Sequence, residues 1–166
     1  MIFVCVGSRN YQFNRLFIKL DELIERDIIK EPVFAQIGVS SYIPKYYQYK
    51  DFLDKNEYIK KIDEADIVIT HGGTGSIMQA LKAGKKVITA TRLEKYGEHI
   101  NDHQIQNNKA FEINGYVLAV YEMDKLGEAL EKIYNGCDNL KPWKNDDPMA
   151  VVNIIDEFIQ KSWSAK

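Results

Sequence analysis

Short apolar segments alternate along the chain with longer segments in which apolar residues recur every three or four positions. The short segments are rich in β-branched residues and predict strands at Ile2–Val6, Pro32–Ile37, Ile67–Thr70, Lys86–Ala90 and Tyr116–Val120, with a further short strand at Tyr49–Leu53. The helical spacing predicts helices over 13–26, 55–64, 76–83, 102–114, 126–133 and 148–162. This alternation predicts an α/β fold, in which a Rossmann-like parallel sheet of about six strands is covered by helices on both faces.

The composition supports a single domain over residues 1–166. Hydrophobic residues make up 45% of the chain and charged residues 28%, which is ordinary for a globular domain with one core. The 22 basic and 24 acidic residues form no basic stripe, so we expect no nucleic-acid partner. No segment approaches the roughly 18 apolar residues of a membrane-spanning helix, and no signal peptide is visible. We therefore expect a cytoplasmic protein whose contact with a membrane is indirect.

The two cysteines, Cys5 and Cys137, are far apart in the sequence. No CxxC pair is present, which argues against a zinc knuckle and against a redox motif. Because Cys5 lies in the apolar segment Ile2–Val6, we expect it to be a buried, reduced thiol.

A glycine-rich turn carries the clearest chemical signal. It follows the predicted strand Ile67–Thr70 and reads HGGTGS over His71–Ser76. Glycine lets the backbone bend sharply and lets a ligand approach closely. The first N–H groups of the helix that follows, together with the helix dipole, favour an anion, and Thr74 and Ser76 add hydroxyl donors. The turn therefore predicts a cradle for a phosphate or pyrophosphate at the carboxyl end of a parallel strand.

Other phosphate motifs do not fit this turn. The pattern GxxxxGK(S/T) is absent because no lysine follows the glycines, and GxGxxG does not follow the first strand. The alternative interpretation is a tight strand-to-helix turn in which Ser76 is the N-cap of the helix.

A second polar cluster, Tyr96–Gln104, follows the predicted strand Lys86–Ala90 and should reach the same edge of the sheet. One interpretation is a metal site formed by His71, His99 and His103. Against it, the expected helix start falls between His99 and His103, so these two side chains would not share one helix face. A second interpretation makes Asn101 the N-cap of a helix with Gln104 at its third position, much like a capping box. The third interpretation is a site for sugar hydroxyls, since amides, carboxylates and imidazoles offer paired donors and acceptors.

Taken together, these segments resemble the donor-binding half of GT-B glycosyltransferases of family 28. They are most similar to the single-domain subunits of two-chain transferases that act in bacterial exopolysaccharide and capsule synthesis. A similar subunit adds the second N-acetylglucosamine in the dolichol pathway. The resemblance covers nearly the whole chain and rests on Ile2–Gly7, Gln36–Gly38, Tyr49–Leu53, Ala65–Ser76 and Tyr96–Gln104.

The resemblance implies that the chain binds a UDP-sugar. It places the diphosphate on the turn Gly72–Ser76, uracil between the side chains of residues 52 and 53, and the ribose at residue 79. The first strand would face the diphosphate across the cleft, and residues 102 and 104 would contact the sugar. The implied binding residues are Gly7, Ser8, Phe52, Leu53, His71, Gly72, Gly73, Thr74, Gly75, Ser76, Gln79, His99, Asp102 and Gln104.

Two positions depart from the family pattern. The family usually has Glu where this chain has Gln79, and that carboxylate would accept two hydrogen bonds from the ribose. An amide offers one acceptor oxygen only, so the ribose contact should be weaker by about 1 kcal/mol, the value of one neutral hydrogen bond. Thr often stands where this chain has Ser8, which keeps the hydroxyl.

The resemblance also implies half of an active site, because GT-B enzymes bind the donor and the acceptor on two separate domains. The expected activity is that of an inverting UDP-sugar glycosyltransferase that transfers a hexose to a lipid-linked acceptor. The general base is expected in a membrane-anchored partner, and Ile154 and Trp163 on the last helix offer a docking surface for it. No Asp-x-Asp motif is present, so we expect no metal and no cofactor.

Two rival functions stay open from the sequence. One is a phosphoribohydrolase of the lysine-decarboxylase-like fold, whose Pro-Gly-Gly-x-Gly-Thr-x-x-Glu signature is similar to His71–Gln79. In this chain His71 replaces the proline and Gln79 replaces the catalytic glutamate, and an amide cannot act as a carboxylate does. The other is a non-catalytic module that binds nucleotide sugars, which would have the same donor site.

Overall fold

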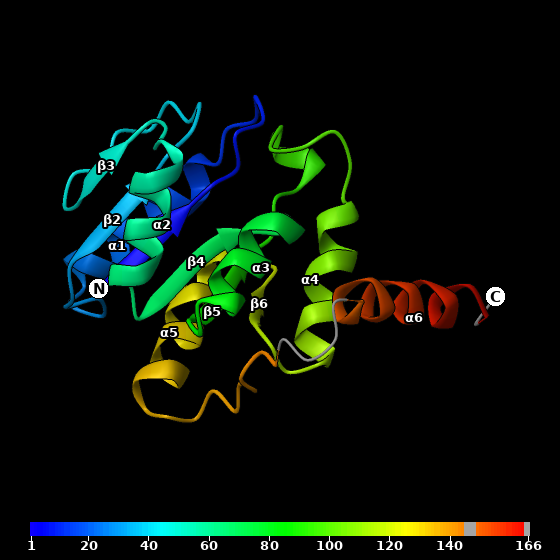
Figure 1. The fold of residues 1–166 in the computed structure, drawn as a ribbon. Coiled ribbons are helices and arrows are strands. Elements are labelled where there is room, and N and C mark those ends of the chain that lie inside the picture. Colours follow the sequence, from blue (N-terminus) through cyan, green and yellow to red (C-terminus); the bar gives the residue numbers. More distant parts are fainter. Residues whose placement is uncertain (145–148, 165–166) are drawn as a thin grey trace.

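The fold is a six-stranded sheet in which every neighbouring pair of strands is parallel. A computed structural model describes residues 1–144 and 149–164, and its strand order is β3-β2-β1-β4-β5-β6 (Figure 1). The strands are β1 Ile2–Cys5, β2 Val33–Gln36, β3 Gln48–Lys50, β4 Ile67–His71, β5 Lys86–Ala90 and β6 Leu118–Val120. The predicted Rossmann-like sheet of six strands is thus confirmed.

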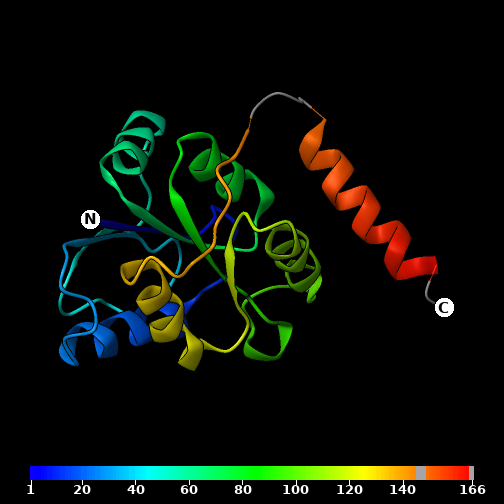
Figure 2. The same ribbon diagram turned by 90° about the horizontal axis from the view of Figure 1, so that it is seen from below.

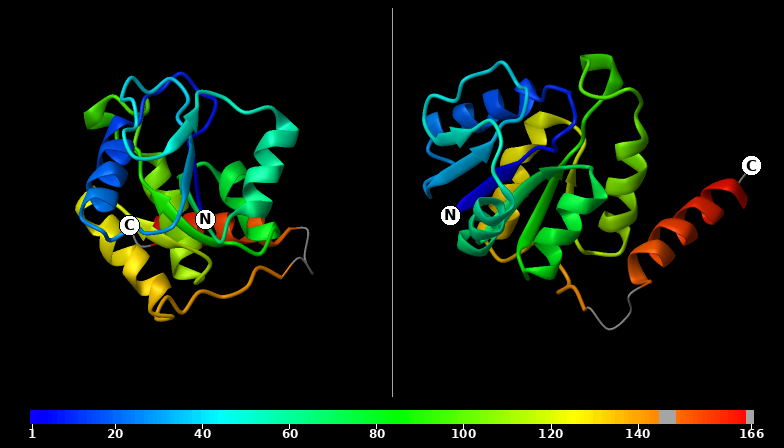
Figure 3. Two further views of the ribbon diagram at one scale, coloured as in Figure 1. Left: turned by 90° about the vertical axis from the view of Figure 1, so that its left-hand side faces the viewer. Right: turned by 45° about the horizontal axis from the view of Figure 1, so that its top comes forward.

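Helices cover both faces of this sheet. The α-helices are α1 Asn14–Glu25, α2 Lys55–Glu64, α3 Thr74–Lys82, α4 His103–Ile113, α5 Leu126–Tyr134 and α6 Ala150–Ser164. Two short 3-10 helices, η1 Glu94–Tyr96 and η2 Met123–Lys125, lie in the connections. Helices α1 and α5 pack on one face, while α2, α3 and α4 pack on the other (Figures 2 and 3).

The alternation of side chains in β1 explains why both faces are covered. Ile2 and Val4 point into the core beneath α1 and α5, whereas Phe3 and Cys5 point into the core beneath α2, α3 and α4. All of these side chains are fully buried. A central strand that is apolar on both sides requires a layer of helices on each side. Cys5 is a free, buried thiol, as predicted.

Most predicted element boundaries agree with the structure within two residues. The helix expected over 148–162 is found at Ala150–Ser164. Residue 148, where the predicted helix began, lies outside the described ranges. The helix expected from Ser76 begins instead at Thr74, with Gly73 at the N-cap position. The interpretation of Ser76 as the N-cap is therefore wrong, because two further residues of the glycine turn already have helical backbone.

Helix α6 is set apart from the layered body. It packs against α4 and extends away from the sheet, with its own C-terminal end far from the other helices (Figures 1 and 2). Val152 and Ile159 on this helix are 44% and 40% exposed. Across the described ranges, none of the helices combines the length and the apolar character needed to cross a bilayer.

Candidate functional site

A cleft opens where the carboxyl ends of β1 and β4 meet. The two strands are paired in register, with Cys5 opposite Thr70, so the turn after each strand faces the turn after the other. The His71 ring fills the space between these turns. A Cβ atom added at Gly7 would lie 2.7 Å from the His71 Nε2 atom, and one added at Gly73 would lie 2.4 Å from it. Both positions therefore require glycine for the close approach of backbone and imidazole.

The N-terminus of α3 faces this cleft with no side chain capping it. Gly73 is the N-cap residue and has no side chain to accept hydrogen bonds from the first turn. The first N–H groups of an α-helix have no partner within the helix, and together with the helix dipole they favour an anion. The glycine turn thus presents free backbone donors to the cleft, as the phosphate-cradle prediction requires.

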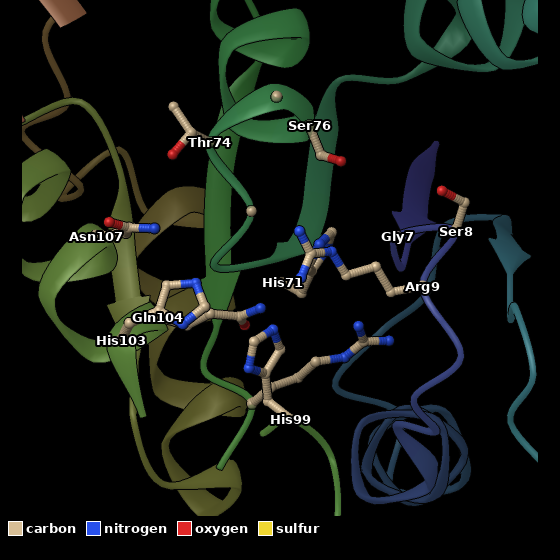
Figure 4. Close-up of a pocket in the computed structure, with 13 residues that line it drawn as sticks. Gly7, Ser8, Arg9, His71, Thr74, Ser76, His99, His103, Gln104 and Asn107 are labelled. Atoms are coloured by element: carbon tan, nitrogen blue, oxygen red, sulfur yellow. The ribbon is translucent and has the colours of Figure 1, made fainter. Parts of the chain in front are cut away.

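The cleft holds a cavity of about 450 Å³ whose lining contains no carboxylate. Its polar side chains come from four separate segments: the turn after β1, the glycine turn, the connection after β5, and α4 (Figure 4). The lining residues are Gly7, Ser8, Arg9, His71, Gly73, Thr74, Gly75, Ser76, Arg92, His99, His103, Gln104 and Asn107. A lining that combines arginines with helix N–H groups and excludes carboxylates suits an anionic ligand.

A smaller hollow of about 290 Å³ continues the cleft on the side of β2 and α2. Both hollows share Gly7, Ser8 and Ser76, so one ligand can span them. Phe52 and Leu53 form the apolar wall of the smaller hollow, and Gln79 of α3 lines it as well. These are the three positions at which the family resemblance expects the nucleoside.

Gln36 holds the wall of the smaller hollow in place. It is buried at the end of β2, its Nε2 donates to the Val6 carbonyl at 2.9 Å, and its Oε1 accepts from the Leu53 N–H at 3.0 Å. One amide side chain therefore ties the turn after β1 to the segment that carries Leu53. No role was expected for Gln36 from the sequence.

His71 forms the floor of the larger cavity and is neutral near pH 7. Burial, followed by the charge of Arg92, lowers its pKa to about 3. The Thr70 hydroxyl donates to the Cys5 carbonyl at 2.9 Å and lies 3.4 Å from His71 Nδ1, which fixes the ring against β1. A neutral imidazole held this way offers a hydrogen bond to the ligand without the mobility of a surface side chain.

Arg92 is a positively charged floor residue that the sequence analysis missed. It is 1% exposed, its Nη2 donates to the Tyr11 carbonyl at 3.0 Å, and its guanidinium lies 5.3 Å from the Phe13 ring centroid. Its Nε has no partner among the described residues. Burial lowers its pKa to about 10, so the side chain remains charged. Its position two residues after the strand Lys86–Ala90 was the signal that could have identified it.

Arg9 adds a second positive charge to the cavity from the exposed turn after β1. It directly follows Gly7 and Ser8, which the resemblance placed at the diphosphate. Asn107 and His103, on the first two turns of α4, were also missing from the expected binding set. His103 had been considered only as a metal ligand, and Asn107 lies three residues beyond the polar cluster Tyr96–Gln104.

Gln104 joins α4 to the glycine turn. Its Oε1 accepts from the Gly72 N–H at 3.1 Å, and the Nδ2 of Asn107 donates to the Gly72 carbonyl at 3.3 Å. A Cβ atom at Gly72 would lie 2.6 Å from the Gln104 Cβ, so glycine is required there too. Gly72 is buried behind the cavity. Gln104 keeps its Nε2 donor for a ligand.

The capping-box interpretation is therefore wrong. Helix α4 begins at His103 with Asp102 at the N-cap position, and Asp102 makes no side-chain cap. Asn101 accepts from the His103 N–H at 3.3 Å, while Gln104 reaches across to the glycine turn.

Asp102 was expected to contact the sugar, but its side chain lies outside both hollows. Its Oδ1 accepts from the Glu94 N–H at 2.7 Å, and it lines neither hollow. Every other expected residue lines the cleft except Gly72, which lies directly behind it.

The three histidines do come together at the larger cavity. The rings of His99 and His103 meet edge to face with their centroids 4.6 Å apart. Over residues 1–144 and 149–164, however, no three His, Cys, Asp or Glu side chains are arranged to hold a metal ion.

Comparison with known proteins adds a family and a set of relatives. The profile of the family described as "Glycosyltransferase family 28 C-terminal domain" matches residues 1–157. UDP-N-acetylglucosamine transferase subunit ALG13 of Homo sapiens is 29% identical over 105 residues, which cover 63% of this chain and 8% of the relative. The protein of the same name from Candida glabrata is 32% identical over 112 residues, which cover 66% of this chain and 50% of the relative. The chain thus spans at most half the length of these relatives.

Solved structures share the fold at low sequence identity. The NMR solution structure of ALG13 superimposes with a TM-score of 0.63 at 21% identity, covering 96% of both chains. The crystal structure of Acinetobacter baumannii MurG superimposes with a TM-score of 0.57 at 16% identity, covering 95% of this chain and 49% of MurG. This chain therefore has the fold of about half of that larger protein.

Proposed function

The chain belongs to the family of glycosyltransferase family 28 C-terminal domains, and we propose that it is the donor-binding subunit of a UDP-sugar glycosyltransferase. The observation that carries the proposal is the carboxylate-free cavity at the uncapped N-terminus of α3, with two arginines in its lining. We propose that uracil binds in the adjoining hollow, which has an apolar wall of Phe52 and Leu53. Because relatives are named as UDP-N-acetylglucosamine transferase subunits, N-acetylglucosamine is the first candidate among the sugars to be transferred.

The proposed chemistry is displacement with inversion at the anomeric carbon. An acceptor hydroxyl attacks that carbon, the bond to the β-phosphate oxygen breaks, and UDP leaves with the bonding electrons. The helix N–H groups and the charges of Arg9 and Arg92 stabilise the negative charge that develops on UDP. With these groups in place, we propose that the reaction needs no cofactor from this chain.

The general base is proposed to come from a partner. A general base must lie within hydrogen-bonding distance of the acceptor hydroxyl. The larger cavity has no carboxylate, and its two buried imidazoles are weakened as bases. The pKa of His71 is lowered to about 3, and burial also lowers the pKa of His99. We propose a membrane-anchored subunit that binds a lipid-linked acceptor and holds this chain at the inner face of the membrane. Exopolysaccharide or capsule synthesis is the process that we propose for the pair.

The direct test is UDP binding by the isolated chain. At a free UDP concentration ten times the Kd, ligand binding should add about 1.4 kcal/mol to the free energy of unfolding. For a domain of this size that corresponds to a rise in Tm of about 3–6 °C, measured by thermal melting monitored by circular dichroism. UMP, which lacks the second phosphate, is the control and should give a smaller rise. An unchanged Tm and no UDP binding by calorimetry at millimolar concentration would contradict the proposal.

Transfer activity separates an enzyme from a binding module. Co-expressed with its partner, the chain should transfer the sugar to a lipid-linked acceptor, and a module without catalytic function would bind UDP-sugar without transfer. The phosphoribohydrolase alternative is disfavoured by family membership and by Gln79 at the position of its catalytic carboxylate. Release of free base from a nucleoside monophosphate would reinstate it.

Gln79→Glu should tighten UDP binding. Gln79 is exposed on α3 and lines the hollow proposed for the nucleoside, so a carboxylate there can accept hydrogen bonds from both ribose hydroxyls. The gain of one hydrogen bond of about 1 kcal/mol predicts roughly fivefold tighter binding by calorimetry. Gln79→Ala, which removes the acceptor, should weaken binding, and 2′-deoxy-UDP should show no difference between Gln79 and Glu. Equal Kd values for UDP across all three proteins would exclude ribose recognition at this position.

Helix α6 is the face that we propose for the partner. Of the two residues expected to dock there, Ile154 is half-buried and the side chain of Trp163 lies outside the described part of the chain, so exposed neighbours carry the proposal. The helix stands away from the sheet, and Val152 and Ile159 share a face on which they are 44% and 40% exposed. Val152→Asp combined with Ile159→Asp should therefore abolish co-purification of the acceptor-binding subunit, because charged groups cannot be buried in an apolar interface without large loss. Unfolding of the isolated chain should change little. Ile18→Asp on α1, which is also 40% exposed, is the control and should leave co-purification intact.

A further inference from the structure

Glu98 is a fully buried carboxylate in the connection between β5 and α4. Its Oε1 accepts from Arg15 Nε at 2.7 Å, and its Oε2 accepts from Arg15 Nη2 at 2.7 Å and from the Leu93 N–H at 3.0 Å. The two side chains thus form a bidentate ion pair, the geometry in which guanidinium and carboxylate groups bind each other most strongly. Three hydrogen bonds leave this carboxylate almost no freedom to move, and it takes no part in lining the cleft.

Arg15 of α1 contacts several residues of the connection between β5 and α4. Its Nη2 also donates to the Thr91 carbonyl at 3.3 Å, and its guanidinium lies 4.1 Å from the Tyr96 ring centroid. Gln12 adds a contact from the same region, donating from Nε2 to the Tyr96 carbonyl at 2.9 Å. One arginine therefore fixes residues 91–98 at several points, including the exposed stretch 94–97.

The residue after Glu98 is the one that enters the cavity. His99 is 5% exposed and lines the cavity with His71, His103 and Gln104 (Figure 4). Its ring stacks on Tyr11 at a centroid distance of 5.2 Å, and its Nδ1 has no partner among the described residues. The backbone that carries His99 is held on its N-terminal side by Glu98, so the orientation of the imidazole depends on the ion pair.

We propose that Glu98, fixed by Arg15, is a positioning residue that orients His99 toward the sugar end of the donor site. The proposal rests on the proposed function for the identity of the ligand, but not for the geometry. A buried ion pair adds little net stability compared with apolar side chains, because both charges lose their hydration. The ion pair does fix the orientation of the Glu98 side chain, since bidentate binding to a guanidinium allows few other geometries. The sugar-binding interpretation of the segment Tyr96–Gln104 is thereby assigned to His99 rather than to Glu98.

The test uses Glu98→Gln, which keeps the shape of the side chain and removes its charge. Side-chain resonances of the histidines are recorded by NMR for the full chain without ligand, since they report on ring orientation directly. We expect the His99 ring resonances to shift and broaden while those of His71, at the glycine turn, stay in place. Glu94→Gln is the control, because Glu94 is exposed in the same connection and should move neither set. Unmoved His99 resonances, or equal displacement of both rings, would overturn the proposal.

A binding experiment connects this geometry to the ligand. The Kd values of UDP and UDP-N-acetylglucosamine are measured for the wild type and for Glu98→Gln. Relative to UDP, the variant should bind the UDP-sugar about threefold to tenfold more weakly, the change expected when one hydrogen bond to the sugar is lost. An equal loss for both ligands would assign Glu98 a purely structural role. Failure of wild-type protein to bind UDP would instead contradict the proposed function and leave the NMR outcome as the test of positioning.

Removing the arginine gives an independent check. Arg15→Met leaves Glu98 buried with only the Leu93 N–H as a partner. Because an unpaired buried carboxylate is unfavourable, the double variant Arg15→Met/Glu98→Gln should have a higher Tm than Arg15→Met alone. If the loss of stability in the double variant equals the sum of the losses in Arg15→Met and Glu98→Gln, the two residues do not act as a unit, contrary to the proposal.

Discussion

Gly75→Asp is expected to abolish UDP binding and at the same time to make the chain more stable. Gly75 is the second residue of α3, is exposed in the cavity, and has no atom within 4 Å of an added Cβ. A non-glycine residue therefore fits, and an acidic one interacts favourably with the helix dipole, for a combined gain of about 0.5–1 kcal/mol. The same carboxylate occupies the N–H groups proposed for the diphosphate. At a separation of about 4 Å near the surface, it would repel that anion by roughly 4 kcal/mol.

The measurement is UDP affinity by calorimetry together with Tm for each variant. Gly75→Asp should weaken binding by about 100-fold or more, while Gly75→Asn, of nearly the same size without charge, should weaken it much less. Gly73 is a poorer position for this experiment, since a Cβ there would lie 2.4 Å from the His71 ring and would disturb the turn itself. A Gly75→Asp variant that melts higher and still binds UDP with wild-type affinity would refute the assignment of the phosphate cradle.

His71 is expected to make the chain markedly less stable in mild acid. Its pKa is lowered to about 3 in the folded chain, chiefly by burial and secondly by the charge of Arg92. In the unfolded chain a histidine titrates near 6.5. As the pH falls below 6.5, the histidine becomes protonated in the unfolded state but stays neutral in the folded state. The free energy of unfolding therefore decreases. At pH 5 the loss from this one residue should be about 2 kcal/mol relative to pH 7.5.

The prediction is tested by urea unfolding between pH 7.5 and 4.5. His71→Asn should remove most of the loss of stability over this range, whatever its effect at neutral pH. His99, whose pKa is also lowered by burial, accounts for a further part of the slope. Parallel pH profiles for the wild type and His71→Asn would show that His71 is not buried as a neutral ring.

The elements of the fold were largely predictable because their signals are local. The helix at 55–64 and the strand at 86–90 lie where apolar spacing predicted them. The glycine turn was recognised from six consecutive residues, HGGTGS. The start of α3 was missed by two residues because capping rules look for a side chain at the N-cap, and here the N-cap is Gly73. That exception leaves the N–H groups free, which is the property the site requires.

The individual contacts of the site were less predictable because they join distant segments. One interpretation of Gln104 was a local capping box, yet its Oε1 accepts from the N–H of Gly72, 32 positions earlier. Asp102 was placed at the sugar, yet its carboxylate binds the Glu94 N–H. The sequence does not reveal that Gln104 binds the glycine turn or that Asp102 binds the Glu94 N–H. Those partners depend on where α4 and the connection before it pack in the fold.

The sequence by itself determined the α/β class, the glycine-rich turn between a strand and a helix, and the family to which the chain belongs. These properties follow from hydrophobic periodicity and from glycine at fixed positions, both of which are encoded within short stretches. Only the tertiary structure decided that Arg92 lies in the floor of the cavity and that Glu98 pairs with Arg15, 83 positions away. The reason is physical: a buried charge takes the partner that packing brings to it, and packing depends on the order of the strands in the sheet. A parallel sheet brings its carboxyl ends to one edge, and there four separate segments become one site.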